Sequence, residues 1–170
     1  YSVTKRFPKC LIQFEDFANQ NAHRLLKKYR HSYCTFNDDI QGIGSVILAG
    51  ILSVMRLLEQ SLENQNILFY GAGTAAFGIA EIIVKKMMLL GMSMDDARHR
   101  ICFFDSKGLV VQGRRNLNNK KKLYAHIIIG ETSLGNVIER DKSSILIGVS
   151  GKPNAFDKSI IQKMAKVNSR

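Results

Sequence analysis

A glycine-rich turn between an apolar strand and a helix constrains this chain most strongly. NILFY (66–70) is a compact apolar run typical of a buried strand, GAG follows at 71–73, and TAAFGIAEIIVKKMMLL (74–90) has helical character. Further apolar runs, ICFFD (101–105) and SSILIGVS (143–150), alternate with helical stretches, of which the last is AFDKSIIQKMAKV (155–167). Such alternation is typical of a parallel sheet covered by helices, so the sequence predicts an α/β fold.

The turn has the residues of a dinucleotide-binding fingerprint in the context that this fingerprint requires. Gly71 permits the tight turn, Gly73 lets the backbone approach a pyrophosphate, and Ala76 allows close packing at the third position. Asp105 ends the second strand, where an acid that binds the adenosine ribose is expected, although the interval from Gly71 is longer than the usual ~20 residues. The alternative is a strand–helix turn that needs glycine for its geometry alone.

The predicted fold is a Rossmann-like parallel sheet with flanking helices, and it is incomplete. A complete dinucleotide-binding fold has two mononucleotide-binding halves, and this chain supplies about one. Before it, CLIQF (10–14) and YCTF (33–36) are predicted strands, and residues 15–29 have the period of a helix. NDDIQG (37–42) is predicted to turn, and residues 43–58 form a helix that is apolar on most faces and is therefore expected to be deeply buried.

Paired acids follow each of the two early strands. Glu15 and Asp16 come after the first strand, and Asp38 and Asp39 come after the second. Since the carboxyl ends of parallel strands share one edge of a sheet, these acids are expected to converge. Several carboxylates without a nearby histidine or cysteine pattern favour Mg²⁺ or Mn²⁺ over Zn²⁺. The alternative, helix N-capping by Asp16 and Asp39, does not explain why both segments carry paired acids.

Composition narrows the classes of partner. The formal net charge is +11, which attracts polyanions, but the basic residues are dispersed, so nucleic-acid binding through charge is the least favoured function. The chain has no continuous apolar run of about 18 residues, so no membrane span is expected. Three scattered cysteines favour reduced thiols and a cytoplasmic protein, with the mitochondrial matrix as an alternative.

Five segments together resemble malic enzyme, in the same order and at similar spacing. They are LIQFEDFANQNAHRLLKKYR, YCTFNDDIQG, ILFYGAGTAAFGIA, DSKGLVVQGR and ILIGVS. The resemblance covers nearly the whole chain and corresponds to the middle of a malic enzyme. It implies that residues 1–32 end the malate-side N-terminal domain and that residues 33–170 form a truncated NAD(P)-binding domain.

The resemblance also implies roles for individual residues. Glu15, Asp16 and Asp39 match the family's metal ligands, and Asp38 matches an acid that supports its catalytic lysine. Asp105 matches the ribose ligand, and Ser106 and Lys122 match positions of NADP-preferring members, so NADP is expected rather than NAD. The positions that match the rest of the nucleotide site are Asn19, Gly71, Ala72, Gly73, Thr74 and Ala75.

The implied activity is oxidative decarboxylation of L-malate to pyruvate and CO₂ in an enzyme that is a homotetramer at full length. The family's general-acid tyrosine and general-base lysine correspond to positions before residue 1, so the chain alone is expected to be nearly inactive. Thr74 replaces an acid usual in the glycine turn, and Ile43 and Gly44 replace a Thr-Ala pair. The alternative is a non-catalytic interaction protein derived from a malic enzyme.

Overall fold

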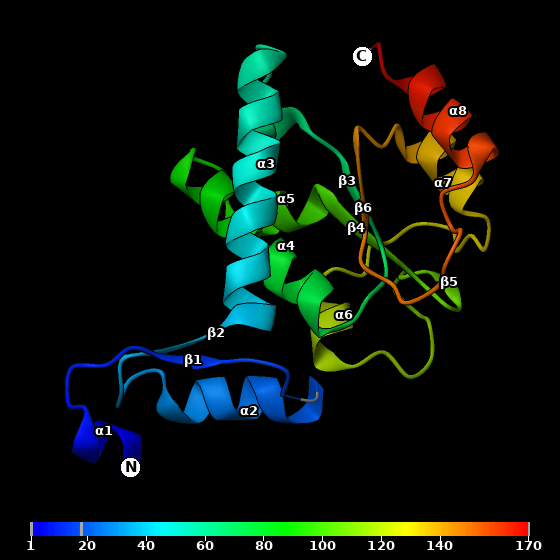
Figure 1. Cartoon of the computed structure of the whole chain (residues 1–170). Helices are drawn as coiled ribbons and strands as arrows, with labels where there is room; N and C mark the ends of the chain where they lie inside the picture. Colours follow the sequence, from blue (N-terminus) through cyan, green and yellow to red (C-terminus); the bar gives the residue numbers. More distant parts are fainter. Residues whose placement is uncertain (1, 18, 170) are drawn as a thin grey trace.

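The computed structural model describes residues 2–17 and 19–169, with Asn19 and Gln20 described by their backbone only. Figure 1 shows the elements in chain order. The N-terminal part holds α1 (Ser2–Arg6), β1 (Ile12–Phe14), α2 (Asn19–Tyr29), β2 (Thr35–Asn37), the π-helix η1 (Asp38–Gly42) and α3 (Ile43–Leu57). The remainder holds η2 (Leu62–Asn64), β3 (Ile67–Tyr70), α4 (Thr74–Leu89), α5 (Met94–His99), β4 (Ile101–Asp105), β5 (Gly108–Leu109), α6 (Asn119–Lys122), α7 (Leu134–Asp141), β6 (Ile145–Gly148) and α8 (Lys158–Val167).

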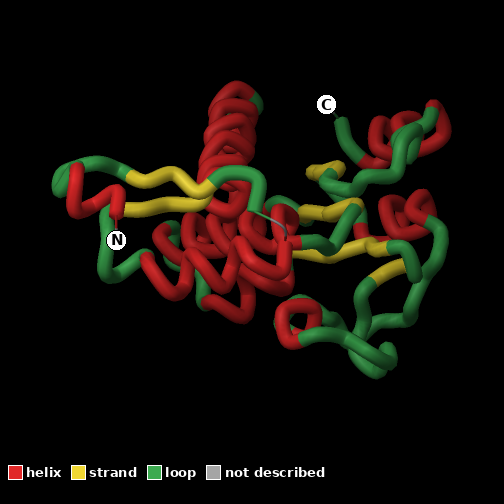
Figure 2. Tube along the Cα trace, turned by 60° about the horizontal axis from the view of Figure 1, so that its bottom comes forward, coloured by secondary structure: helices red, strands yellow, loops and turns green. Residues whose placement is uncertain are grey.

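The main sheet has the order β5-β4-β3-β6. β3 pairs in parallel with β4 and with β6, so that Ile67 lies opposite Ile101 on one side and Ile145 on the other. β5 pairs antiparallel to β4 at the outer edge. The predicted parallel α/β sheet with flanking helices is confirmed, and Figure 2 shows its strands between helices on either side.

Two apolar cores hold the helices against this sheet. The larger one joins α4 and α5 to one face, and at its centre the fully buried rings of Phe69 and Phe103 stack with centroids 4.9 Å apart. The smaller one joins α7 and α8 to the other face around Leu68, Val137 and Ile160. Alternate residues of β3 therefore feed opposite cores, because successive strand side chains point to opposite faces.

The N-terminal strands form a sheet of their own. β1 and β2 pair in parallel, with Phe14 opposite Asn37. Ala22 and Leu26 of α2 form a small core with Ile40 of η1. The NDDIQG segment does not turn as predicted, because Asn37 caps a π-helix by accepting a hydrogen bond from the Ile40 amide at 2.9 Å. This short helix runs directly into α3 and brings the N-terminal sheet to the start of α4.

The expectation that α3 is deeply buried is wrong. Only Gly44 and Met55 are buried in this helix, whereas Val46 is 71% exposed and Leu57 is 80% exposed. Residues 38–57 are long and apolar enough to cross a membrane by length and composition alone, with a mean hydropathy of 1.7 and 22% of that window buried. Core helices of globular proteins pass the same test, so the feature that distinguishes α3 is its uncovered apolar face.

Two glycines allow η1 and α3 to pack closely on α4. A Cβ at Gly78 would lie 2.6 Å from the backbone oxygen of Ile40, and one at Gly44 would lie 2.5 Å from the side chain of Ile82. Real Cβ contacts are essentially never that short, so Gly78 is required where backbone meets backbone. The dinucleotide fingerprint predicts a close-packing role for Ala76, which is fully buried, but gives no signal for Gly78.

Candidate metal and nucleotide site

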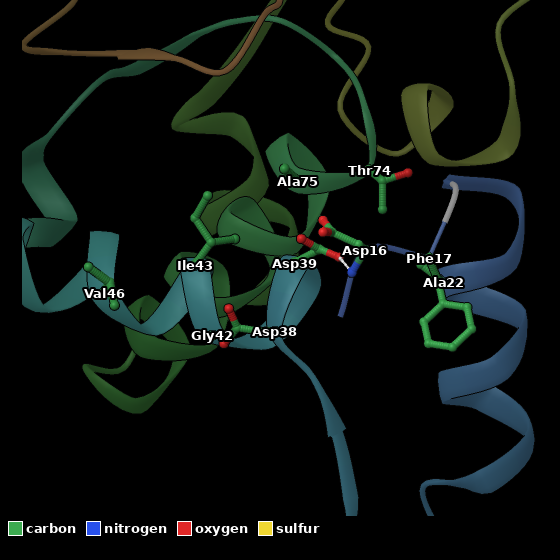
Figure 3. Close-up of a pocket in the computed structure, with 10 residues that line it drawn as sticks. All are labelled: Asp16, Phe17, Ala22, Asp38, Asp39, Gly42, Ile43, Val46, Thr74 and Ala75. Atoms are coloured by element: carbon green, nitrogen blue, oxygen red, sulfur yellow. Dashed lines mark hydrogen bonds between the residues drawn. The ribbon is translucent and has the colours of Figure 1, made fainter. Parts of the chain in front are cut away.

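A cavity of about 800 Å³ lies where the N-terminal sheet, η1 and the start of α4 meet. Figure 3 shows that three separate parts of the chain form its walls. Its lining residues are Asp16, Phe17 and Ala22 from the N-terminal segment, Asp38, Asp39, Gly42, Ile43 and Val46 from η1 and α3, and Thr74 and Ala75 from α4. The predicted acid segments and the predicted glycine turn therefore border one space.

Three of the four predicted acids converge, and two of them, Asp16 and Asp39, line this cavity. Oxygen atoms of Glu15, Asp16 and Asp39 all lie within 4.8 Å of one another. They meet because β1 and β2 are parallel and the acids follow the same ends of both strands. Asp16 adopts a left-handed φ of 54°, and its amide donates to Asp39 Oδ2 at 3.2 Å. Like charges this close repel one another, and the oxygen donor set suits a hard divalent cation such as Mg²⁺ or Mn²⁺.

The fourth acid, Asp38, lies apart from the carboxylate cluster, and Asp39 does not cap a helix. Asp38 is half-buried beside Gly42, apart from the carboxylates of Asp16 and Asp39 (Figure 3). Asn37, rather than Asp39, caps η1, and Asp39 lies inside the helix. Helix capping therefore does not account for Asp39. That Asp38 supports a catalytic lysine stays a prediction.

The glycine turn has the backbone that its sequence requires. Gly71 has a φ of +121°, and a Cβ there would lie 2.6 Å from the backbone oxygen of Val149. Gly73 is the N-cap of α4, no side chain caps the helix there, and there is open space where a Cβ would stand. Thr74 and Ala75 face the cavity, and Ala72 is half-buried. Free N–H groups and the positive end of a 16-residue helix suit a phosphate group here.

Asp105 lies at the end of β4 as predicted, in a cluster with two cations. Arg114 Nη2 donates to its Oδ2 at 2.6 Å, Lys121 Nζ donates to the same oxygen at 2.5 Å, and the Lys107 amide donates to Oδ1 at 2.9 Å. The Asp105 side chain is 10% exposed. Burial alone would raise the pKa of Asp105, but hydrogen bonds from Arg114, Lys121 and the Lys107 amide lower that pKa to about 2.

The structure separates the residues expected to select the nucleotide. Ser106 is exposed next to Asp105, whereas Lys122 is exposed on the wall of a different cavity of about 100 Å³, which Asp95 and Arg98 also line. Lys121 is the lysine of this run that reaches Asp105. The sequence signal for it was the KKK run itself, but neighbouring helical residues point in different directions, and the pattern does not say which one turns inward. The side chain of Asn19 lies outside the described residues.

The glycine turn and Asp105 lie in a segment that matches a known protein family. The family model for the malic enzyme NAD-binding domain matches residues 40–170. The chain belongs to the malic enzyme family. Its first 39 residues lie outside that match, so the division into residues 1–32 and 33–170 stays a prediction.

Relatives in this family are NADP-dependent malic enzymes. The chain is 48% identical to the Mus musculus enzyme over 161 residues and 49% identical to the Anas platyrhynchos enzyme over 170 residues. A Homo sapiens relative, named as mitochondrial, is 45% identical over 170 residues. These alignments cover 95%, 99% and 99% of this chain, but only 28%, 30% and 28% of the relatives. The chain thus spans less than a third of the length of these three relatives.

Solved malic enzymes share the fold. The Entamoeba histolytica malic enzyme superposes with a TM-score of 0.74 at 23% identity, over 95% of this chain and 34% of that one. The NAD-dependent malic enzyme of Thermotoga maritima superposes with a TM-score of 0.70 at 24% identity, over 90% and 39%. The described part of the chain therefore has the architecture of the malic enzyme NAD-binding domain, preceded by an acid-bearing segment.

Proposed function

We propose that this chain is the metal- and nucleotide-binding part of an NADP-dependent malic enzyme. The reaction would be the oxidative decarboxylation of L-malate to pyruvate and CO₂ with reduction of NADP. The observation that supports it best is the meeting of Glu15, Asp16 and Asp39 within 4.8 Å of one another at a cavity that Thr74 and Ala75 also line. A metal and a nucleotide bound there would share one cleft.

Glu15, Asp16 and Asp39 would hold Mg²⁺ or Mn²⁺, which when bound would polarise the oxygen on malate C2 and stabilise negative charge as CO₂ leaves. Residues 71–75 would bind the pyrophosphate through backbone amides, and NADP would accept the hydride. Asp39 would have two roles, because it also accepts the Asp16 amide and so fixes the turn that carries two of the acids. Asp38 would support the proton-transferring groups from the edge of the cavity.

The charge around Asp105 favours NADP over NAD. An acid that binds the ribose hydroxyls of NAD must have free carboxylate oxygens, but Oδ2 of Asp105 already accepts from Arg114 and Lys121. One carboxylate with two cations leaves a net positive charge, which suits the additional 2′-phosphate of NADP. Ser106 would add a hydroxyl beside that phosphate. We assign the phosphate contact to Lys121 and Arg114 in place of the predicted Lys122.

Calorimetry of the chain with Mn²⁺ and NADP tests the metal part of the proposal. Asp39→Asn is expected to weaken Mn²⁺ binding by about 100-fold or more, because it removes one of three charged ligands. Asp95→Asn is the matched control and should leave the affinity unchanged, since Asp95 is 87% exposed and lines a different cavity. Equal Mn²⁺ affinity in the wild type and Asp39→Asn would refute the metal assignment.

The nucleotide part is tested with 2′,5′-ADP and 5′-ADP, which differ by the phosphate in question. Lys121→Met is expected to weaken the binding of 2′,5′-ADP by about tenfold or more while leaving that of 5′-ADP unchanged, since a charge-assisted hydrogen bond is lost. Lys122→Met is the control and should bind both nucleotides as the wild type does. If Lys122→Met alone lost the preference for 2′,5′-ADP, the phosphate contact would belong to Lys122.

A non-catalytic interaction protein is the second candidate function. The exposed apolar face of α3 favours it, since Val46, Val54 and Leu57 are all exposed on that helix. Absence of binding of both Mn²⁺ and NADP to the wild-type chain would support this candidate over the enzyme. L-malate as substrate, a homotetramer at full length and a cytoplasmic location stay predictions, and two of the relatives are named as mitochondrial.

A further inference from the structure

Helix α2 is tied to the nucleotide-binding half by a side-chain contact outside the cavity. Lys120 Nζ of α6 lies 3.2 Å from His23 Nε2 of α2, so the contact joins residues 97 positions apart in the sequence. The same ammonium lies 3.3 Å from Glu81 Oε1 of α4 and 5.9 Å from the centroid of the Phe77 ring. One lysine therefore connects three helices.

This contact joins two helices that each adjoin a different wall of the cavity. Asp16 and Phe17 immediately precede the α2 segment that carries His23, and Thr74 and Ala75 open the α4 helix that carries Glu81. Lys120 thus bridges the helix beside the carboxylates to the helix beside the glycine turn. Its neighbour in α6, Lys121, contacts Asp105, so this four-residue helix meets both the N-terminal segment and the ribose end of the site.

The contact fixes the protonation state of the imidazole. A lysine ammonium can only donate hydrogen bonds, so His23 Nε2 must accept, and the ring must be neutral with its proton on Nδ1. Glu81 of α4 is the other charged group that contacts Lys120. Lys85 of α4, Arg98 of α5 and Tyr124 line the pocket that Glu81 and Lys120 also line. Burial and the Lys120 charge lower the pKa of His23 from its ordinary 6.5, and the Glu81 charge opposes them.

We propose that His23, Lys120 and Glu81 form a latch that holds α2 against α4 and so couples the metal site to the nucleotide site. Lys120 is a positioning residue, because it touches neither site and acts through the two helices that carry them. With the latch closed, α2 and α4 are already held together when a ligand binds. No binding free energy is then lost in ordering one wall of the cavity against the other. This coupling rests on the proposed metal and nucleotide binding, but the latch itself does not.

The latch is expected to open on acidification. Protonated His23 has no lone pair on Nε2 to accept from Lys120, and the two positive charges then repel each other. Because the folded-state pKa of His23 is lowered, the unfolded chain binds more protons in the intervening range. The contribution of the latch to folding is therefore complete above about pH 6.5 and is lost as the pH falls through the lowered pKa.

Two ligand-free measurements on the full chain test the latch. Lys120→Met keeps the aliphatic stem but removes the charge, and Lys122→Met is the matched control one residue beyond Lys121. Amide hydrogen exchange of residues 19–29 at pH 7.5 is expected to be roughly five- to tenfold faster in Lys120→Met and unchanged in Lys122→Met. Titration of His23 by NMR should occur below pH 6.5 in the wild type and move upward in Lys120→Met, since the adjacent cation is gone. Lys120→Arg, which retains donors, should restore slow exchange.

A third measurement tests the coupling. The Mn²⁺ affinity of the wild-type chain is expected to rise with saturating NADP, and this rise should be lost in Lys120→Met but kept in Lys120→Arg and Lys122→Met. Retention of the full rise in Lys120→Met would overturn the coupling. If the wild type binds neither ligand, the proposed function fails, while exchange and titration still decide the latch. Identical exchange and identical His23 titration in the wild type and Lys120→Met would overturn the latch itself.

Discussion

The pairing of Asp105 with Arg114 and Lys121 makes a pH-dependent contribution to stability that can be measured by replacing the carboxylate. The pKa of Asp105 falls from 3.8 to about 2 on folding. At about 1.36 kcal/mol per unit, that drop corresponds to about 2.4 kcal/mol. The Arg114 and Lys121 side chains retain 19% and 20% exposure, so solvent screening reduces the expected contribution to about 1.5–2 kcal/mol.

The sign follows from the direction of the shift. A lowered carboxylate pKa stabilises the folded chain above about pH 4, and this stabilisation is lost as the pH falls through the folded value near 2. Asp105→Asn should therefore lower the free energy of unfolding by about 1.5–2 kcal/mol at pH 6, and by about half as much at pH 3. Urea unfolding followed by circular dichroism at both pH values measures the difference.

The control for this experiment is Asp95→Asn, in which the replaced carboxylate is 87% exposed and pairs with Arg98 at 3.9 Å. A pair of that kind contributes little, so the control should change the free energy of unfolding by less than about 0.5 kcal/mol at either pH. If Asp105→Asn cost the same at pH 3 as at pH 6, its effect would come from lost packing, and the ion-pair reasoning would be refuted.

Two further predictions concern packing and reactivity. Gly78→Ala should destabilise the chain by about 2–3 kcal/mol in thermal or urea unfolding, because the new Cβ meets the Ile40 backbone oxygen at 2.6 Å. The control is Gly50→Ala in α3, where a Cβ has open space, and it should stabilise the chain by about 0.5–1 kcal/mol. Equal effects of the two substitutions would contradict the close-contact argument. Half-buried Cys102 should resist iodoacetamide at pH 8 in the native chain while exposed Cys34 reacts, because burial raises the pKa of Cys102 to about 12. Mass spectrometry of the labelled peptides measures this, and rapid labelling of Cys102 in the native chain would contradict the raised pKa.

The sequence predicted the long helices and the strands of the parallel sheet because these depend on local patterns, whereas the predicted turn at residues 37–42 is a π-helix. Short apolar runs such as NILFY and ICFFD are typical of buried strands. The turn from β3 into α4 requires a positive φ at residue 71, which glycine adopts readily. The convergence of Glu15, Asp16 and Asp39 followed from the same source, since two parallel strands must end at the same edge. The resemblance to malic enzymes then gave these residues their expected roles.

The tertiary structure alone decided which side chains meet across long sequence separations. Periodicity made α3 apolar on most faces, but whether those faces are covered depends on what packs there, and most of the helix is exposed. The lysine run indicated positive charge but not which residues each lysine contacts. In the structure, Lys120 contacts His23 and Lys121 contacts Asp105, because neighbouring residues of α6 point in different directions. Gly78 is needed because Ile40 lies against it, which no local pattern reveals. Local sequence sets the conformation of each segment, whereas contacts between distant segments depend on how the whole chain packs.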